Sequence, residues 1–208
     1  MENPKHIAVA GNIGVGKTTL VTKLAHYYGW KPKFEAVDNN PYLADFYGDM
    51  SQWAFNLQIY FLNSRFNHIL DLKEEEGTII QDRTIYEDAF IFAKNLRDSG
   101  HLTARDYDTY FELFQTMVRT VSPPDLLIYL KADISKLTGQ IAKRGRDYES
   151  TISIKYLEDL NRYYNQWIGE YQEGKLLVID ANKLDYVSNP DDLGFVINKI
   201  DAELFGLF

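Results

Sequence analysis

Short apolar runs bounded by turn residues recur along the chain and predict buried β-strands. Four compact runs cover residues 6–10, 78–81, 125–131 and 175–180, and residues 33–36 form a weaker fifth run. Runs of this kind are typical of strands that are covered on both faces of a sheet.

Longer amphipathic segments separate these runs and predict α-helices. They cover residues 17–28, 51–75, 86–99, 104–121, 134–143, 154–172 and 191–204. This alternation of strands and helices favours the α/β class, with a five-stranded parallel sheet and helices on both of its faces. A ligand of such a fold lies beyond the carboxyl ends of the strands, so we expect Gly11 and Asp82, which follow two of the runs, at the site.

The length of 208 residues suits one domain with a full core, and no internal repeat, low-complexity tract or Pro/Gly/Ser-rich linker divides it. We therefore expect residues 1–208 to form a single domain. The net charge of -8 argues against nucleic acid or an anionic membrane as a partner, because both favour an excess of Lys and Arg. Any anionic ligand must then meet a local cluster of basic residues.

The chain contains no cysteine, which excludes disulfides, zinc–thiolate sites and thiol catalysis. Its first segment, MENPKHIAVAG, has one apolar run that is too short for a signal peptide or a membrane span. We therefore expect a cytoplasmic protein.

The segment GNIGVGKTT, residues 11–19, carries the pattern G-x-x-x-x-G-K-[ST] after a strand and at the start of a helix, where this motif belongs. Its glycines let backbone N–H groups turn toward a phosphate, and the helix N-terminus adds partial positive charge. Lys17 and the Thr18 hydroxyl can reach the terminal phosphates and a Mg²⁺ ion. The pattern predicts a nucleoside triphosphate site made by Gly11, Asn12, Ile13, Gly14, Val15, Gly16, Lys17, Thr18 and Thr19.

The segment IIQDRTIYED, residues 79–88, places charged residues directly after a predicted buried strand. Asp82 can hold the Mg²⁺ that Thr18 also touches, and Arg83 can face a phosphate or an acceptor oxygen. Asp82 and Thr84 can also cap the helix that follows, and capping does not exclude catalysis. Glu35, at the end of the weak strand, should lie at the same edge, where its carboxylate can accept the proton of an attacking hydroxyl.

Two predicted helices carry polar side chains at helical spacing. Gln58 and Arg65 share a face of one helix, and Asp88 and Phe92 share a face of the next. An arginine and an aspartate at such depth are rarely left unpaired, so we expect an Arg65–Asp88 ion pair. The Gln58 amide can hold N6 and N7 of adenine while Phe92 stacks on the ring, although such a glutamine is often a satisfied core amide.

A basic cluster lies in the segment KRGRDYES, residues 143–150. Lys143, Arg144 and Arg146 can form a solvated helix end or a mobile lid that closes over phosphates. Beside a phosphate loop we favour the lid, because arginine clamps contribute to phosphoryl transfer.

Two short patterns allow a different function, that of a GTP-binding switch. The letters DFYG at residues 45–48 match D-x-x-G, and NKLD at residues 182–185 match N-K-x-D. Both patterns are weak here, because the first follows a helical start instead of a strand and only one predicted helix follows the second.

Taken in order, GNIGVGKTT, the Glu35 strand end, Tyr47 with WAFNLQIYFLNSR, DRTIYED and KRGRDYE resemble the deoxynucleoside kinase family, particularly its bacterial deoxyadenosine and deoxyguanosine kinases. The resemblance runs from Ile7 to about Asp185. It implies a P-loop kinase fold with a short arginine-bearing lid, and transfer of the γ-phosphoryl group of Mg²⁺-ATP to the 5′-hydroxyl of a deoxynucleoside. It also implies a homodimer joined through helices, often with feedback inhibition by the end-product triphosphate.

The resemblance also implies roles for individual residues. Glu35 is the general base at the 5′-hydroxyl with Arg83 beside it, while Asp82 takes the place of an acid assigned to Mg²⁺ or, as the runner-up, to the base. Tyr47 and Glu149 match residues that hold the sugar 3′-hydroxyl. Gln58, Arg65 and Asp88 match the residues that read the base, and Arg144 and Arg146 match the arginines of the lid. The ANKLDYV loop, residues 181–187, falls where the family covers the adenine of ATP, which leaves the GTPase letters without a role.

The chain departs from the family pattern at two places. Ala36 stands where a proline commonly follows the catalytic Glu, so we expect a less rigid loop, and Thr84 replaces the serine of the acid-Arg-Ser triplet. The Arg65–Asp88 pair argues against the thymidine-preferring branch and favours a purine, with deoxyadenosine as the first choice. The alternative enzyme is a nucleoside monophosphate kinase of the thymidylate kinase type, which needs a second basic site for the phosphate of its acceptor.

Overall fold

A five-stranded sheet forms the centre of the molecule, in a computed structural model that describes residues 6–34, 37, 40–146, 149 and 151–206. The strand order is β2-β3-β1-β4-β5, and every neighbouring pair is parallel. The bounds are β1 (His6–Gly11), β2 (Lys31–Lys33), β3 (Ile79–Asp82), β4 (Leu126–Lys131) and β5 (Lys175–Asp180). The predicted α/β class with a parallel five-stranded sheet is confirmed.

The predicted helices are present in order with changes at their ends, and two short helices, residues 43–48 and 181–183, were not predicted. The first group is α1 (Lys17–Tyr28), α2 (Leu43–Gly48), α3 (Met50–Glu74), α4 (Ile85–Glu87), the π-helix η1 (Asp88–Ala93) and α5 (Lys94–Asp98). The second group is α6 (Ala104–Val118), α7 (Ile134–Arg144), α8 (Ile154–Glu170), the short 3₁₀ helix η3 (Ala181–Lys183) and α9 (Pro190–Phe205). Because α4, η1 and α5 follow one another without a gap, they form one helical segment.

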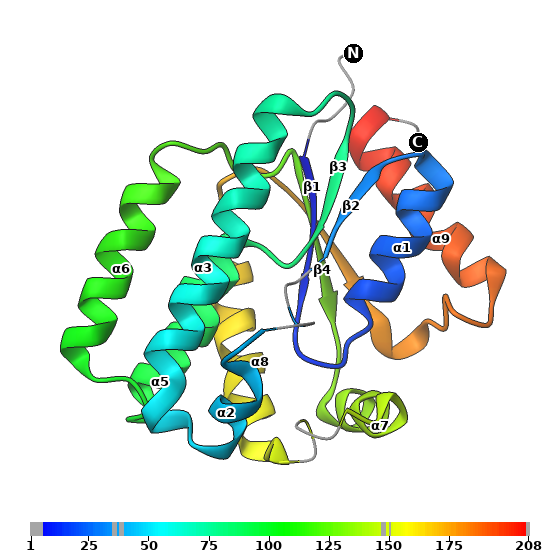
Figure 1. Cartoon of the computed structure of the whole chain (residues 1–208). Helices are drawn as coiled ribbons and strands as arrows, with labels where there is room; N and C mark the ends of the chain where they lie inside the picture. Colours follow the sequence, from blue (N-terminus) through cyan, green and yellow to red (C-terminus); the bar gives the residue numbers. More distant parts are fainter. Residues whose placement is uncertain (1–5, 35–36, 38–39, 147–148, 150, 207–208) are drawn as a thin grey trace.

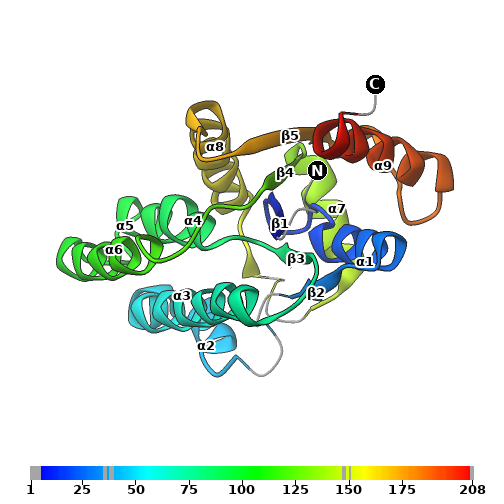
Figure 2. The same ribbon diagram turned by 90° about the horizontal axis from the view of Figure 1, so that it is seen from above.

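The sheet separates two layers of helices, with α1 and α9 on one side and α3, α4, α5, α6 and α8 on the other (Figures 1 and 2). Successive residues of β1 point to opposite layers, as the pleat of a strand requires. Ile7 and Val9 pack in the core that includes α1 and α9, whereas Ala8 and Ala10 pack in the core that includes α8. None of the described helices is long and apolar enough to cross a membrane.

The weak fifth strand was predicted at the wrong place. Residues 33–36 form the more apolar run, but the strand is Lys31–Lys33 and pairs with β3 from Lys31↔Ile79 to Lys33↔Gln81. Pro32 argues against a strand in the sequence, yet β2 lies at the edge of the sheet, where a missing N–H costs no ladder hydrogen bond. Glu35 is therefore not the last residue of the strand, and both Glu35 and Ala36 lie outside the described residues.

The buried imidazole of His6 gives the fold a predictable pH dependence. Burial lowers the pKa of His6 from its ordinary value, so the unfolded chain takes up a proton below about pH 6.5, whereas the folded chain does so only at lower pH. The contribution of this group to the free energy of unfolding is complete above that pH and is lost below it, by at most about 1.4 kcal/mol per pH unit. Urea unfolding at about pH 7.5 and about pH 5.5 measures this loss.

The variant His6→Gln is the matched control, because His6 Nε2 lies 2.9 Å from Gln81 Oε1 and a glutamine amide can still donate there. The variant cannot take up a proton at this position, so its stability should fall less between the two pH values. An equal fall in both proteins would assign the pH dependence to other groups, such as His68, whose pKa is also lowered by burial.

Candidate active site at the phosphate loop

The loop between β1 and α1 has a backbone conformation and close contacts that require glycine at two positions. Gly14 and Gly16 have φ angles of 83° and 98°, which side chains rarely adopt. A Cβ on Gly14 would come 2.8 Å from the carbonyl oxygen of Leu137, and one on Gly16 would overlap the hydroxyl of Tyr186. Glycine therefore lets the backbone turn tightly under its neighbours, as a phosphate-binding loop requires.

Neighbouring elements brace this loop from two sides. Asn12 Nδ2 donates to the carbonyl oxygen of Leu157, at 2.9 Å, and to Asn161 Oδ1, at 2.7 Å, which ties the loop to α8. The Tyr186 hydroxyl lies 3.1 Å from the carbonyl oxygen of Gly16. Burial raises the pKa of Tyr186, so its hydroxyl keeps the proton that it donates. The loop is thus held from α8 through Asn12 and from the segment after η3 through Tyr186.

Lys17 and Thr18, the first residues of α1, face the charged end of β3. The Lys17 ammonium donates to the carbonyl oxygens of Gly11 and Asn12 at 2.9 and 3.1 Å. The Thr18 hydroxyl donates to Asp82 Oδ2 at 2.5 Å. Because β1 and β3 are neighbours, with Val9 opposite Asp82 in the register, the ends of both strands meet at this edge.

Asp82 is 2% exposed, and its Oδ1 has no hydrogen-bond partner among the described residues. A buried carboxylate oxygen without a donor is costly unless a cation or another group meets it. A hydroxyl and a carboxylate are ligands that Mg²⁺ accepts, in company with water and phosphate oxygens. The residues present at this point therefore fit a Mg²⁺ ion.

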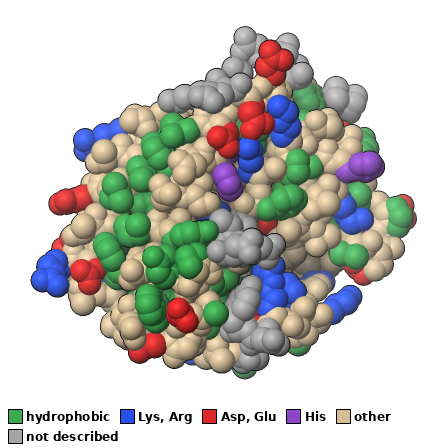
Figure 3. Space-filling view, in the orientation of Figure 1, with side chains coloured by type: hydrophobic (Ala, Val, Ile, Leu, Met, Phe, Trp, Pro, Cys, Tyr) green, Lys and Arg blue, Asp and Glu red, His purple; other side chains and the backbone are tan. Residues whose placement is uncertain are grey.

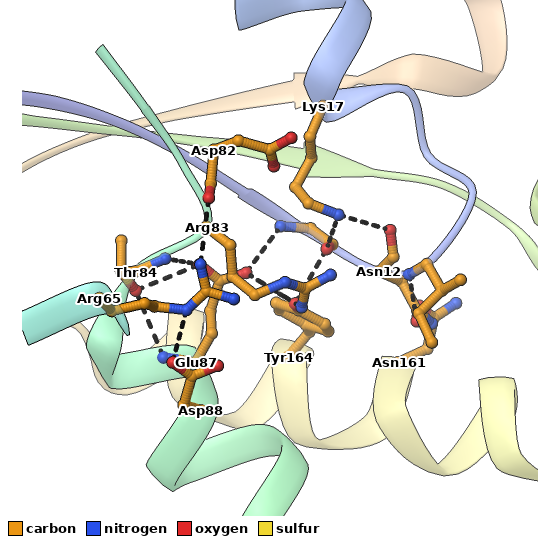
Figure 4. Close-up of polar contacts among 12 residues, drawn as sticks. Asn12, Lys17, Arg65, Asp82, Arg83, Thr84, Glu87, Asp88, Asn161 and Tyr164 are labelled. Atoms are coloured by element: carbon orange, nitrogen blue, oxygen red, sulfur yellow. Dashed lines mark hydrogen bonds and ion pairs between the residues drawn. The ribbon is translucent and has the colours of Figure 1, made fainter. Parts of the chain in front are cut away.

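Arg83 has φ 70°, the only positive value at a non-glycine residue in the described part of the chain. Such a conformation persists only where the surroundings hold it, and it is common at functional sites. The backbone N–H of Arg83 donates to the carbonyl oxygen of Val9 at 2.9 Å. Its guanidinium lies 4.3 Å from the centre of the Phe92 ring and donates to the Tyr164 hydroxyl at 2.9 Å. Figure 4 shows the Asp82 carboxylate on the side of Lys17, whereas the Arg83 guanidinium extends toward Tyr164.

The predicted ion pair between Arg65 and Asp88 is present. Arg65 Nε donates to Asp88 Oδ2 at 2.5 Å, and both side chains are buried. Asp88 and Phe92 lie on the π-helix η1, a type of helix that occurs frequently at functional sites. Gln58 is 3% exposed, and its Oε1 finds no partner among the residues that the structure describes.

The basic cluster lies at the end of α7. Arg144 and Arg146 both pair with the Glu149 carboxylate, through a close bidentate contact from Arg144 and a 3.6 Å contact from Arg146 Nη1. Glu149 is 4% exposed and both arginines are about one-third exposed. Figure 3 shows Lys and Arg side chains gathered on this face near α7, the local basic cluster expected in an acidic protein.

One cavity of about 640 Å³ joins these groups. The predicted residues that line it are Ile13, Gly14, Gly16, Lys17, Thr18, Thr19, Tyr47, Gln58, Asp82, Arg83, Asp88, Phe92, Arg144, Arg146 and Glu149. Arg65 is not at its wall but pairs with Asp88, which is. Phe34 and Val37, on either side of the undescribed Glu35, also line the cavity.

Several residues of the site were not predicted from the sequence. Phe61 and Tyr156 line the cavity, beside Lys143 of the predicted basic cluster. Glu87 and Tyr164 do not line it but bond to the phosphate loop from below. The spacing T-x-x-E marks Thr84 and Glu87 as a capping box, which the structure contains, but nothing local in the sequence signals their contact with the loop.

The GTPase letters have other uses in the structure. The letters DFYG fall within α2 instead of after a strand. Asp185 Oδ1 accepts from the backbone N–H groups of Val187 and Ser188, at 3.2 and 3.1 Å, so it closes a turn. These contacts explain both patterns without a guanine nucleotide.

The sequence is similar to one family model and to several proteins of related function. A family model described as deoxynucleoside kinase matches residues 7–205. The deoxyadenosine/deoxycytidine kinase of Bacillus subtilis is 40% identical over 196 residues, which cover 93% of this chain and 90% of that protein. The deoxyguanosine kinase of Lactobacillus acidophilus is 39% identical over 207 residues, which cover 95% of this chain and 90% of that protein.

A solved structure agrees with these matches. The structure of deoxyadenosine kinase from M. mycoides with bound dATP has a TM-score of 0.83 and 31% sequence identity, covering 95% of this chain and 99% of that one. The named relatives differ in the base of their nucleoside, so the comparisons alone do not select a base.

Proposed function

The chain belongs to the deoxynucleoside kinase family, and we propose that it transfers the γ-phosphoryl group of ATP to the 5′-hydroxyl of a deoxynucleoside. The observation that carries this proposal is the single cavity that runs from the phosphate loop past Asp82 and Arg83 to Gln58 and Asp88. Phosphoryl transfer requires little beyond positioning and charge stabilisation, and this cavity brings both kinds of group together.

At the donor end, the phosphate loop and Lys17 would hold the ATP phosphates, with Arg144 and Arg146 above them as the lid. Asp82 and Thr18 would hold Mg²⁺, which neutralises the charge that develops on the phosphate oxygens. Asp82 Oδ1, which is buried and has no hydrogen-bond partner among the residues described, supports this assignment.

At the acceptor end, Glu35 would accept the proton of the 5′-hydroxyl, and Arg83 would stabilise the oxygen beside it. Tyr47 and Glu149 would hold the sugar 3′-hydroxyl. In the structure the Glu149 carboxylate pairs with Arg144, so one carboxylate would serve both the sugar and the lid. This sharing would link closure of the lid to the presence of the acceptor.

The base would be an adenine, read by Gln58 and by Asp88, which Arg65 orients, with Phe92 against the ring. The buried Oε1 of Gln58 is an acceptor without a partner in the described part of the chain. Adenine offers the N6 amino group beside N7, whereas guanine offers two acceptors on the same edge and would leave Oε1 unsatisfied. Deoxyadenosine is therefore our first choice of substrate.

No observation favours the two alternatives. A nucleoside monophosphate kinase needs a basic group for the phosphate of its acceptor, but Arg65 and Arg83 at this end are already bonded to Asp88 and Tyr164. Membership of the deoxynucleoside kinase family does not support a GTP-binding switch either.

We also propose that the chain acts as a single-domain cytoplasmic homodimer. Leu70 and Leu113 are each 38% exposed on α3 and α6, which pack against each other and offer apolar surface to a second copy. Size-exclusion chromatography with light scattering tests this assembly, and a monomer at all concentrations would contradict it.

The direct test of the activity is a panel of deoxynucleosides and ribonucleosides with ATP and Mg²⁺, in which formation of the monophosphate is measured. We expect turnover with deoxyadenosine to exceed turnover with deoxyguanosine and thymidine. Phosphorylation of deoxynucleoside monophosphates, without phosphorylation of any nucleoside, would overturn the proposal.

Replacement of Gln58 by Ala should reduce the preference for deoxyadenosine over deoxyguanosine by ~10–100-fold, because a pair of hydrogen bonds to a base contributes ~1–3 kcal/mol to discrimination. The KM for ATP should change little. The ratio of kcat/KM values for the two nucleosides measures the effect. Gln140→Ala is the control, since Gln140 lines the same cavity from α7, and an unchanged ratio in Gln58→Ala would remove Gln58 from base recognition.

A further inference from the structure

Glu87 is a buried carboxylate whose two oxygens have different tasks. Glu87 is 0% exposed and ends α4, four residues after Arg83 in the chain. Its Oε2 accepts from the backbone N–H and the hydroxyl of Thr84, at 2.7 and 3.1 Å, which completes the cap of α4. Its Oε1 lies 3.2 Å from the backbone nitrogen of Gly11 and 2.7 Å from the hydroxyl of Tyr164. The helix cap needs only Oε2, so the contacts of Oε1 have a different purpose.

Tyr164 on α8 meets the same point from the other side. Its hydroxyl accepts from Arg83 Nη1 at 2.9 Å and can donate to either of two acceptors. These are Glu87 Oε1 and the carbonyl oxygen of Gly11, which lies 2.9 Å away. Burial raises the pKa of Tyr164 well above its ordinary value, so the hydroxyl keeps its proton.

Gly11 and Arg83 are therefore linked through the side chains of Glu87 and Tyr164. Figure 4 shows Arg83 together with these two side chains. The N–H of Gly11 meets Glu87, and its carbonyl oxygen meets both Tyr164 and the Lys17 ammonium. On the other side, Arg83 Nη1 lies 3.8 Å from Glu87 Oε1 in addition to its bond to Tyr164. These contacts connect two residues that line the cavity, Lys17 and Arg83, through Gly11, Glu87 and Tyr164.

We propose that Glu87 and Tyr164 are positioning residues that fix the Arg83 guanidinium relative to the Gly11 end of the phosphate loop. Neither side chain lines the cavity, but both contact Arg83, which does, and Gly11, whose carbonyl oxygen accepts from the cavity-lining Lys17. The catalytic consequence rests on the proposed function, because it concerns alignment of the acceptor hydroxyl with the donor phosphates. Misplacement of reacting groups by about 1 Å can lower a rate by ~10²-fold.

The variants Tyr164→Phe and Glu87→Gln test this role. Phenylalanine removes only the hydroxyl, and glutamine replaces one of the two acceptor oxygens by an NH₂ group, which cannot accept from the N–H of Gly11 or of Thr84. We expect kcat to fall ~10-fold or more in each, with KM for ATP and for the nucleoside within about 3-fold of the wild type, because the contacts align the transition state. Tyr163→Phe is the matched control, since the Tyr163 hydroxyl is bonded to Asp98 at 2.6 Å, away from the loop.

A structural role alone would lower the melting temperature without changing kcat per folded molecule. The Arg83→Ala background separates the two roles. If Tyr164 acts through Arg83, its replacement by Phe should have little further effect on kcat there. Equal kcat in Tyr164→Phe and Tyr163→Phe, in a wild type that makes the monophosphate, would overturn the inference and leave the proposed function intact.

Hydrogen exchange provides a readout that does not depend on turnover. The amides of residues 11–18 should exchange faster in Glu87→Gln and Tyr164→Phe than in Tyr163→Phe. If the wild type makes no monophosphate, the proposed function fails, and the exchange data still decide whether the two side chains hold the loop. Unchanged exchange in both variants would overturn the inference. If Glu87→Gln does not fold, Tyr164→Phe carries the test.

Discussion

Asp82→Asn is expected to lower kcat by ~10²–10³-fold at a fixed Mg²⁺ concentration, because a bound metal ion contributes several kcal/mol of charge stabilisation in the transition state. The substitution keeps the shape of the side chain and an oxygen for the Thr18 hydroxyl, which now donates to Asp82 Oδ2. It removes the negative charge from a carboxylate that is 2% exposed. Steady-state rates over a range of Mg²⁺ concentrations measure both kcat and the metal requirement.

The dependence on Mg²⁺ separates two roles for Asp82. If Asp82 holds the ion, the concentration needed for half-maximal rate should rise ~10-fold or more, and added Mg²⁺ should restore part of the activity. Loss of activity with an unchanged Mg²⁺ requirement would instead make Asp82 the proton acceptor. Asp180→Asn is the control, because Asp180 also ends a strand, β5, but does not line the cavity.

Local signals in the sequence were sufficient for most elements of the fold. The run before Gly11 and the amphipathic segment from Lys17 fix β1 and α1, because a buried strand and a helix have different periods of apolar residues. The phosphate loop could be predicted for the same reason, since its glycines and its lysine act within one short segment. Elements whose stability is decided by neighbours in sequence were therefore predictable.

Two elements could not be predicted from local signals: the edge strand β2 and the π-helix η1. Lys31, Pro32 and Lys33 are a poor strand by composition, and they form one because an edge position requires hydrogen bonds on one side only. The π-helix at Asp88–Ala93 is likewise invisible in a pattern that fits an ordinary helix. The π-helix contributes Asp88 and Phe92 to the cavity, where local preference can give way to the geometry of a site.

The support beneath the site was the least predictable part. Tyr164 and Gly11 are 153 residues apart in the chain, and Glu87 and Gly11 are 76 apart. A tyrosine on an amphipathic helix usually serves the core, and nothing in its neighbours marks the one whose hydroxyl meets a loop. Sequence motifs identify the side chains that contact a ligand. The side chains that support those residues come from distant parts of the chain and can be identified only in the folded structure.

Glu35→Gln should leave ATP binding nearly unchanged and lower kcat by ~10²–10⁴-fold, the usual effect of removing a placed general base. In the proposed function the phosphate loop, residues 11–18, holds ATP, and this substitution leaves the sequence of that loop unchanged. Glu35 itself lies outside the described residues, but Phe34 and Val37 on either side line the cavity. Titration of ATP by calorimetry and steady-state rates of monophosphate formation measure the two effects separately.

The control is Glu75→Gln, which acts on the strand that leads to Glu35. The Glu75 carboxylate pairs with Lys31 and Lys33 of β2, at 3.2 and 2.7 Å, so its loss loosens this strand without removing a carboxylate from the cavity. Only a small change in kcat is expected there, because ion pairs this exposed contribute little. Wild-type turnover in Glu35→Gln, together with a loss in Asp82→Asn that Mg²⁺ does not restore, would move the proton acceptor from Glu35 to Asp82. If added Mg²⁺ restores activity to Asp82→Asn but not to Glu35→Gln, Glu35 is the residue that takes the proton and Asp82 is the residue that holds the metal.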